Sequence, residues 1–209
     1  MGALMETALF VAWFEEAARL VRADRDRLTR LDAAIGDADH GTNLDRGLTE
    51  VLKALAESAP ASEAEVLTTA GATLIRRVGG ASGPLYGSLF RQMGKVLQTP
   101  VTLAAFAGAF EEGVVAVERL GKAALGDKTM VDALAPASRA LALAVRDGVG
   151  VREALDQAAR AAGEGSKATI PMQARKGRAS YLGERSIGHE DPGAASATLI
   201  MTALANVAG

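Results

Sequence analysis

Apolar residues recur every three or four positions along most of the chain, which is the spacing of helices that bury one face. Phe10, Phe14, Val21 and Leu28 form one such run, and similar runs continue to the end of the sequence. Hardly any stretch alternates with period two, and β-branched residues seldom cluster, so little of the chain suits a sheet. The pattern predicts an all-α fold with eight helices, over residues 3–29, 41–58, 62–78, 83–98, 102–120, 130–147, 151–163 and 192–207.

Length and composition favour a single domain over residues 1–209. A chain of 209 residues that is 49% hydrophobic can bury a core of its own. The predicted helices follow one another without a proline- or serine-rich linker, and the abundant alanine permits close packing between them. We therefore expect one all-α domain of closely packed helices.

Charge and cysteine content exclude several classes of function. The formal net charge is −2, which gives no general electrostatic reason to bind nucleic acid. The absence of cysteine excludes disulfides and thiolate metal sites. Glu6, Glu15 and Glu16 interrupt the apolar first stretch, which argues against a signal peptide or a membrane span. These observations favour a cytoplasmic protein.

Four connections are unlike ordinary turns: residues 31–43, 77–88, 125–132 and 163–196. The last is long enough to be either functional or disordered. Its apolar Tyr181, Leu182 and Ile187 stand between basic residues and glycines, which suits a loop that folds over something, although a disordered segment stays an alternative.

The first connection, "LDAAIGDADHGTNLDRG", concentrates negative charge. Asp32, Asp37 and Asp39 lie so close in sequence that their mutual repulsion must be offset. Magnesium prefers carboxylate oxygens and leaves room for phosphate oxygens, so a magnesium site that carries a nucleotide is one interpretation. A calcium loop of the EF-hand type does not fit, since position 34 is alanine. The alternative is a metal-free loop in which one aspartate caps a helix and the others are solvated.

Several predicted helix starts are suited to hold phosphate. Thr42 and Asn43 fall where a helix begins, and "GGASGPLYGS" runs into another helix with Pro84 in its first turn. Asp191 and Pro192 form a cap followed by a first-turn proline. The glycine-rich loop lacks the order of a Walker motif, and a helix start without a ligand is its alternative.

The last two connections offer cations and an apolar surface. Asp127 and Lys128 precede a predicted helix, and Met130 could lie against a nucleotide base or belong to the core. Arg178 and Arg185 could bind phosphate or be solvated charges.

In their order along the chain, "IGDADHGTNLDRG", "GGASGPLYGS", "GDKTMVDAL" and "ARKGRASYLGERSIGHEDPGAAS" resemble the nucleotide-binding subunits of the dihydroxyacetone kinase family. The resemblance covers essentially the whole chain. It implies an eight-helix barrel with the nucleotide, ADP or ATP, at one end, held through two magnesium ions by Asp32, Asp37 and Asp39. It further implies nucleotide contacts from His40, Gly41, Thr42, Asn43, Ala81, Ser82, Gly126, Met130, Arg178, Asp191, Pro192 and Gly193.

Ala38 and His40 are the two residues of the first motif whose roles are least obvious. The family usually reads GDGDHG, whereas Ala38 replaces the middle glycine here, and a positive φ at that position would strain an alanine. His40 could be read as a phosphohistidine or a base. We expect it instead to hydrogen-bond phosphate, because the resemblance places the substrate-holding histidine on another subunit.

The resemblance implies one part of a two-part kinase. A separate K subunit would hold dihydroxyacetone, and this chain would deliver the γ-phosphoryl group, with Arg178 as the catalytic cation. Because no substrate domain follows, we expect the free-standing type, in which a phosphocarrier (M) subunit of the phosphotransferase system recharges bound ADP. The sequence also allows a homodimer.

Two other functions stay open from the sequence. One is a non-catalytic nucleotide sensor that regulates a partner, using the same loops. The other is the nucleotide subunit of a related kinase with a different carrier-bound substrate.

Overall fold

The computed structural model describes residues 4–208, and within this range the chain is helical without strands, as predicted. The long helices are α1 (Thr7–Ile35), α2 (His40–Ser58), α3 (Glu63–Arg77), α4 (Ser82–Val96), α5 (Leu103–Gly121), α6 (Val131–Arg146), α7 (Val151–Ala168) and α8 (Pro192–Val207). A short 3-10 helix, η1 (Arg178–Ser186), precedes α8. Residue 3, where the first predicted helix begins, lies outside the described range, and residues 4–6 are not helical, so this helix starts later than predicted.

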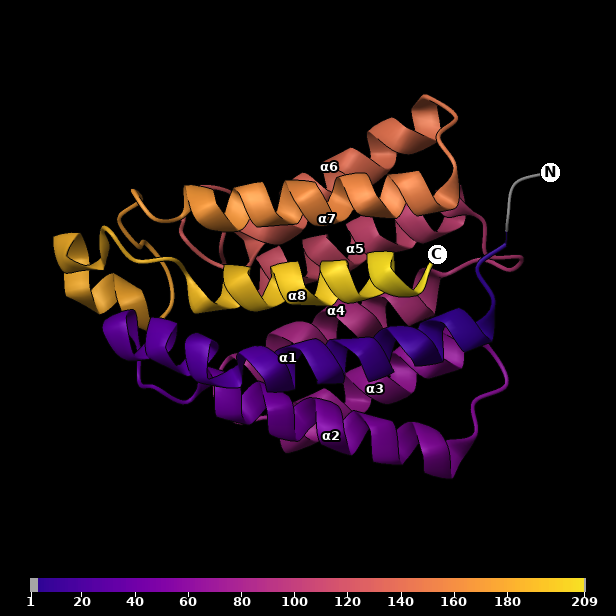
Figure 1. The fold of residues 1–209 in the computed structure, drawn as a ribbon, viewed down its shortest axis with the longest axis horizontal. Coiled ribbons are helices and arrows are strands. Elements are labelled where there is room, and N and C mark those ends of the chain that lie inside the picture. The colour runs from indigo at the N-terminus through magenta and orange to yellow at the C-terminus, as the bar shows by residue number, and fades with distance from the viewer. Residues whose placement is uncertain (1–3, 209) are drawn as a thin grey trace.

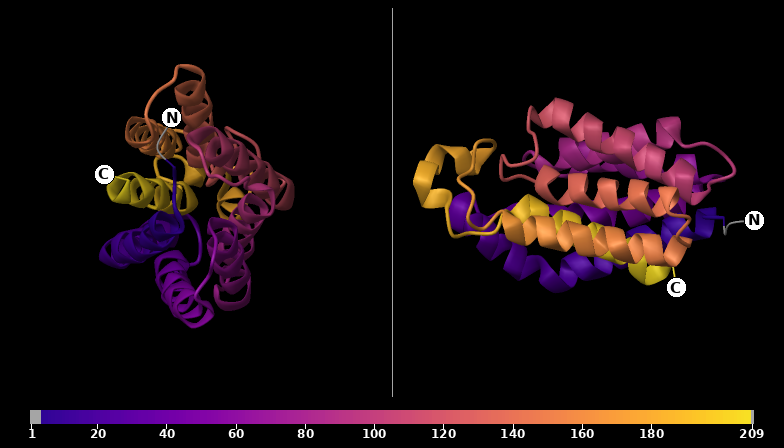
Figure 2. Two further views of the ribbon diagram at one scale, coloured as in Figure 1. Left: turned by 90° about the vertical axis from the view of Figure 1, so that its right-hand side faces the viewer. Right: turned by 90° about the horizontal axis from the view of Figure 1, so that it is seen from above.

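The long helices are arranged as a closed ring (Figures 1 and 2). Each helix packs against the next one in the chain, and α8 packs against α1. A cluster of aromatic side chains fills the interior, with Trp13 against Phe14, Phe90 and Phe106. The indole Nε1 of Trp13 donates a 2.8 Å hydrogen bond to the carbonyl oxygen of Ile200, which joins α1 to α8.

The antiparallel order places four connections at one end of the ring. The α1–α2, α3–α4, α5–α6 and α7–α8 connections all lie at the left-hand end in Figure 1. These are the four connections that stand out in the sequence. The alternation of the helices therefore brings together segments that are up to about 150 residues apart.

Two predicted helix ends are wrong. Helix α1 continues to Ile35 instead of ending at residue 29, because Asp32 and Ile35 still lie on its buried face. Helix α7 continues to Ala168 instead of 163, since its glycines serve close packing and do not end the helix. A Cβ atom at Gly165 would lie 2.0 Å from the carbonyl oxygen of Asp132.

The segment 163–196 is folded, so the disordered alternative is not what the structure shows. Its middle part contains η1, and a small apolar cluster of Ile35, Ala174 and Ala179, with Leu182 against it, fixes η1 to the last turn of α1. Tyr181 is 88% exposed and does not contribute to this packing.

Among the described residues, no helix combines the length and apolar character that crossing a membrane requires.

Candidate functional site

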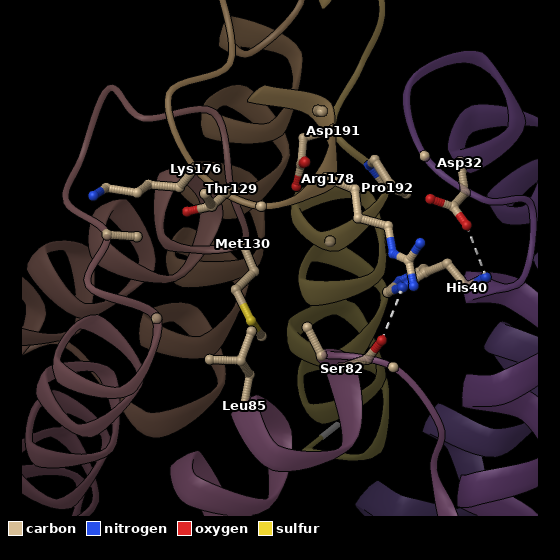
Figure 3. A pocket seen from close by; sticks show the side chains of 18 of the residues that line it. Asp32, His40, Ser82, Leu85, Thr129, Met130, Lys176, Arg178, Asp191 and Pro192 are labelled. Carbon is tan, nitrogen blue, oxygen red and sulfur yellow. Dashed lines mark hydrogen bonds between the residues drawn. The ribbon is translucent and has the colours of Figure 1, made fainter. Parts of the chain in front are cut away.

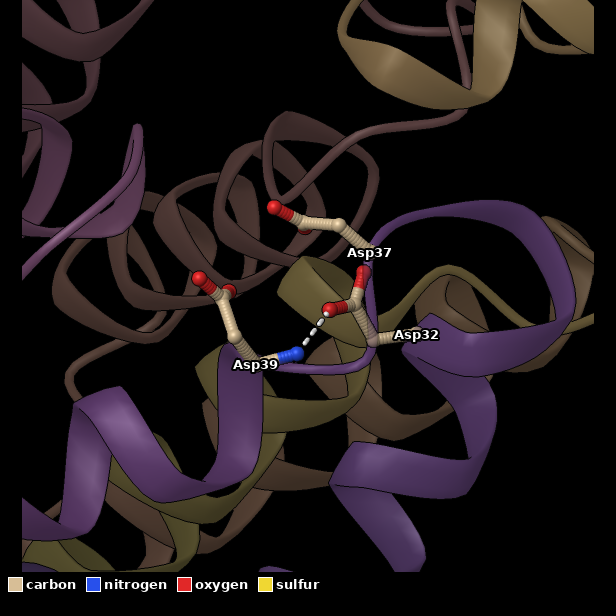
Figure 4. Close-up of side chains that lie close together, drawn as sticks. All are labelled: Asp32, Asp37 and Asp39. Atoms are coloured by element: carbon tan, nitrogen blue, oxygen red, sulfur yellow. Dashed lines mark hydrogen bonds between the residues drawn. The ribbon is translucent and has the colours of Figure 1, made fainter.

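Three carboxylates meet between α1 and α2 (Figure 4). Asp32 lies in the last turn of α1, Asp37 in the following loop, and Asp39 at the N-cap of α2. Each offers an oxygen within 4.8 Å of those of the other two. Oxygens on opposite sides of one magnesium ion are about 4 Å apart, so this donor set suits hard divalent cations.

Asp32 also caps α2. Its Oδ2 atom accepts hydrogen bonds from the backbone N–H groups of Asp39 (2.8 Å) and His40 (3.1 Å). The capping alternative raised by the sequence is therefore correct for Asp32. It does not exclude a cation, because a carboxylate has lone pairs for both partners.

The loop between the two helices is shaped around these carboxylates. A Cβ atom at Gly36 would lie 2.0 Å from Oδ1 of Asp32, so a side chain there would displace the carboxylate. Ala38 adopts a φ of 63°, in the left-handed region that favours glycine. The strain expected from the alanine in the motif is present.

His40 lies in the wall of the site (Figure 3), and both its ring nitrogens have hydrogen-bond partners. Nδ1 is 3.2 Å from Oγ of Ser82, and Nε2 is 2.8 Å from Oγ of Ser196. The Ser196 hydroxyl is in turn 2.6 Å from the Tyr86 hydroxyl and donates to the carbonyl oxygen of Gly193 at 3.0 Å.

The buried ring of His40 is suited to stay neutral. Burial lowers the pKa of His40, against the opposite effect of the neighbouring aspartates. With Ser196 donating to Gly193, the hydroxyl of Ser196 accepts from Nε2–H of His40, and Nδ1 then accepts from Ser82. The imidazole of His40 thus links the starts of α2, α4 and α8. Its expected direct contact with phosphate stays a prediction.

Three helix N-termini lie around the same region. Helices α2, α4 and α8 begin at His40, Ser82 and Pro192. Asp191 caps α8 by accepting from the N–H group of Ala194 at 2.7 Å. Converging helix starts favour a bound anion, which suits the phosphates of a nucleotide.

A cavity of about 250 Å³ lies between these helix starts and the carboxylates. Its apolar side is formed by Leu85, Val117 and Met130, while its polar side holds the aspartates and Ser82. An apolar wall opposite a polar end is the arrangement that a nucleotide base and its phosphates require.

Arg178 reaches into the cavity from the start of η1 (Figure 3). Its guanidinium forms a 3.0 Å ion pair with Oδ2 of Asp37, and its side chain is 65% exposed. Lys176 also lines the cavity. Arg185 is not among the described residues that line the cavity. Of the two arginines that the sequence suggested, Arg178 is therefore the one that reaches it.

The loop before α6 is held by a residue that the sequence did not single out. Asp132 is buried and accepts hydrogen bonds from the N–H groups of Gly126 (2.6 Å) and Thr129 (2.8 Å). The signal available was a carboxylate in the first turn of a helix, which is too common to identify a site.

Most predicted site residues meet around this cavity. Those that line it are Asp32, Asp37, Asp39, His40, Ala81, Ser82, Met130, Arg178, Asp191, Pro192 and Gly193. The described lining lacks Gly41, Thr42, Asn43 and Gly126, whose assignments stay predictions. Gly41 has a packing role, since a Cβ atom there would lie 2.1 Å from the carbonyl oxygen of Arg25. Leu85 and Val117, apolar residues of α4 and α5, also form part of the wall.

Residues 34–206 match the family model described as the DAK2 domain. The ADP-binding subunit DhaL of a PEP-dependent dihydroxyacetone kinase from Escherichia coli K12 is 42% identical over 197 residues, which cover 93% of this chain and 94% of that protein. The ADP-binding subunit DhaL of a PTS-dependent dihydroxyacetone kinase from Lactococcus lactis is 36% identical, covering 94% and 95%.

A solved structure has a similar fold. The dihydroxyacetone kinase of C. freundii, in complex with AMP-PNP and Mg²⁺, superposes with a TM-score of 0.75 at 25% identity. The match covers 99% of this chain and 35% of that chain, so this protein spans about a third of the length of its structural neighbour.

Proposed function

Because the chain belongs to the DAK2 domain family, among the ADP-binding subunits of dihydroxyacetone kinases, we propose that it carries the nucleotide of a two-part dihydroxyacetone kinase in the cytoplasm. The observation that supports this most strongly is the cavity, which joins three clustered carboxylates, three helix N-termini and an apolar wall. The named relatives cover nearly the same length, which supports a subunit of the same kind.

ADP or ATP is held through two magnesium ions by Asp32, Asp37 and Asp39. Bound by these carboxylates, the ions would neutralise phosphate charge and orient the γ-phosphoryl group. The three carboxylate oxygens, all within 4.8 Å of one another, support binding of divalent cations at this point. Gly36 supports the arrangement by leaving space for the Asp32 carboxylate.

The remaining parts of the cavity position the nucleotide. The backbone N–H groups of Ala81 and Ser82 donate to phosphate oxygens, and the positive end of the α8 dipole, at Pro192 and Gly193, faces them. Leu85 and Met130 contact the base. Arg178 moves its charge from Asp37 to the phosphoryl group that is transferred, where it stabilises the charge that spreads in the transition state.

The acceptor is dihydroxyacetone bound to a separate K subunit that docks at this end of the ring. Its hydroxyl oxygen attacks the γ-phosphorus and gives up its proton to solvent, the bond from the γ-phosphorus to the bridging oxygen breaks, and ADP stays on this chain. A phosphocarrier subunit of the phosphotransferase system then rephosphorylates ADP in place. The names of the PEP- and PTS-dependent relatives support this last step.

Reconstitution tests the proposal. The purified chain, loaded with γ-labelled ATP and magnesium, should not phosphorylate dihydroxyacetone by itself. Adding a K subunit should transfer the label to dihydroxyacetone within a single turnover. Tight nucleotide binding without transfer in any such mixture would favour the nucleotide sensor instead, and full turnover by this chain alone would contradict the two-part scheme.

A further inference from the structure

Residues 169–190, here called the cap segment, connect α7 to α8 across the nucleotide end of the ring. The segment carries Lys176 and Arg178 into the cavity and leads directly to Asp191, which caps α8. Its apolar cluster fixes only the middle part, against the end of α1. The position of its two ends depends on other contacts.

Both ends of the cap segment are bound to one ammonium group. Nζ of Lys128 donates to the carbonyl oxygens of Thr169 (2.8 Å), Met172 (3.1 Å) and His189 (2.5 Å). Thr169 and Met172 belong to the first turn of the segment, and His189 lies near its end. The three ammonium protons thus have three backbone acceptors, which lie up to 20 residues apart in sequence.

The environment of Lys128 suits a positioning role better than phosphate binding. Its side chain is only 1% exposed although the residue lies next to the cavity, and its φ of 63° lies in the left-handed region. A buried ammonium is tolerated where hydrogen bonds compensate it, and here three backbone carbonyls do so. An ammonium engaged in this way has no proton left for a phosphate oxygen.

The loop that carries Lys128 is itself fixed. Asp132 binds the backbone on both sides of Lys128, at Gly126 and Thr129. The carbonyl oxygen of Asp127 accepts from the N–H group of Arg175, in the cap segment, at 3.0 Å. The α5–α6 loop is therefore a rigid base to which the cap segment is attached.

We propose that Lys128 is a positioning residue of the nucleotide site, whose ammonium holds both ends of the cap segment and thereby sets the position of Arg178 over the phosphates. The role of the nucleotide in this statement rests on the proposed function. Arginine cannot replace the lysine, because its planar fork cannot point at three carbonyls arranged around one atom.

The absence of cysteine from the chain allows a direct test. Lys128→Cys can be alkylated in denaturant with 2-bromoethylamine and refolded, which restores an ammonium at nearly the length of lysine. Lys128→Met supplies a neutral side chain, and Lys128→Gln keeps part of the donors if the methionine variant does not fold. Lys122→Met is the matched control, since Lys122 is an exposed lysine in the same connection and also has a positive φ.

Hydrogen exchange and MgADP binding are then measured for each form. We expect Lys128→Met to speed amide exchange in residues 169–190, with α3 and α4 unchanged, and to weaken MgADP binding about tenfold, as for the loss of one charge-assisted hydrogen bond. The aminoethylated cysteine should restore both properties, and Lys122→Met should change neither. Lys128→Gln should fall between the wild type and Lys128→Met.

Coupling to Arg178 separates positioning from a general loss of stability. If Lys128 acts through the cap segment, Lys128→Met and Arg178→Ala should weaken the binding of MgATP, which carries the γ-phosphoryl group that Arg178 contacts, by less together than the product of their separate effects. Unchanged exchange and affinity in Lys128→Met and Lys128→Gln would overturn the proposal, as would fully independent effects. Failure of the wild-type chain to bind MgADP would instead contradict the proposed function.

Discussion

Arg178 is the residue on which the proposed transfer step depends most. Its side chain is exposed and forms a surface ion pair with Asp37, which contributes little to stability. We therefore expect Arg178→Ala to leave the melting temperature within about 2 °C of the wild type. Single-turnover transfer to K-bound dihydroxyacetone should slow about 10³-fold, the contribution typical of a cation at the transferred phosphoryl group.

Arg178→Lys distinguishes geometry from charge. Lysine lacks the planar fork that matches phosphoryl oxygens, so it should not restore the rate. Arg185→Ala is the matched control, since Arg185 belongs to the same 3-10 helix and is exposed. A normal rate in Arg178→Ala would show that Arg178 is a solvated charge, and would leave Lys176 or the magnesium ions to stabilise the transition state.

Asp191 should make stability depend on pH. Burial raises the pKa of Asp191 to about 7, from an ordinary 3.8. The folded state therefore favours the protonated form, and this contribution is complete below about pH 4 and is lost as the pH rises through 7. In the wild type, this loss should lower the free energy of unfolding by about 1–2 kcal/mol between pH 5 and 7. Asp191→Asn keeps the cap of α8 but has no group that titrates, so this part of the decrease should be absent from the variant.

Denaturant titrations at several pH values, without nucleotide or magnesium, check this expectation. Asp147→Asn is the control. The ion pair with Arg146 lowers the pKa of the exposed Asp147, so that this group titrates below the range tested. Equal slopes for the wild type and Asp191→Asn would contradict a raised pKa at Asp191.

At the residue scale, the sequence predicted groups that chemistry makes conspicuous. Clustered aspartates are rare enough to suggest a site, and the family resemblance selected Arg178 among the arginines of the long loop. Asp32, Asp37 and Arg178 do meet around one cavity. The partners of His40 and Lys128 could not be predicted. They are serine hydroxyls and backbone carbonyls from distant segments, which leave no pattern in the sequence.

At the scale of elements, the loop between α1 and α2 stores strain that can be relieved. Ala38→Gly should raise the free energy of unfolding by about 0.5–1 kcal/mol, because glycine adopts a positive φ without the steric cost of a Cβ atom. Ala33→Gly, the same substitution at an exposed position inside α1, should lower it by about the same amount. Denaturant unfolding of both variants measures the two effects, and a loss of stability in Ala38→Gly would contradict the assignment of strain.

Helix positions followed from the sequence better than helix ends did. The apolar spacing reports which face is buried, so α2 to α6 begin and end within two residues of the prediction. Helices α1 and α7 run longer because their last turns carry polar or small residues that pack at the site. Aspartate and glycine are typical of loops, so the sequence alone places Asp32 and Gly165 outside the helices. Only their spatial neighbours show that both belong to a last helical turn.

At the scale of the whole molecule, the ring explains why the site exists at one end. Because successive helices alternate in direction, every second connection lies at the same end of the ring. The prediction of eight consecutive helices already implied this arrangement. The closing contact between α8 and α1 could not be read from the sequence, because it depends on packing between the two ends of the chain.

The central claim is that the nucleotide is held through divalent cations at the three aspartates, and thermal unfolding with ADP tests it most directly. ADP at about 100 times its dissociation constant, with magnesium, should raise the melting temperature by about 5–10 °C. Excess chelator or Asp37→Asn should remove most of this shift, whereas Asp26→Asn, an exposed position on α1, should keep it. An equal shift with ADP in excess chelator would contradict the account.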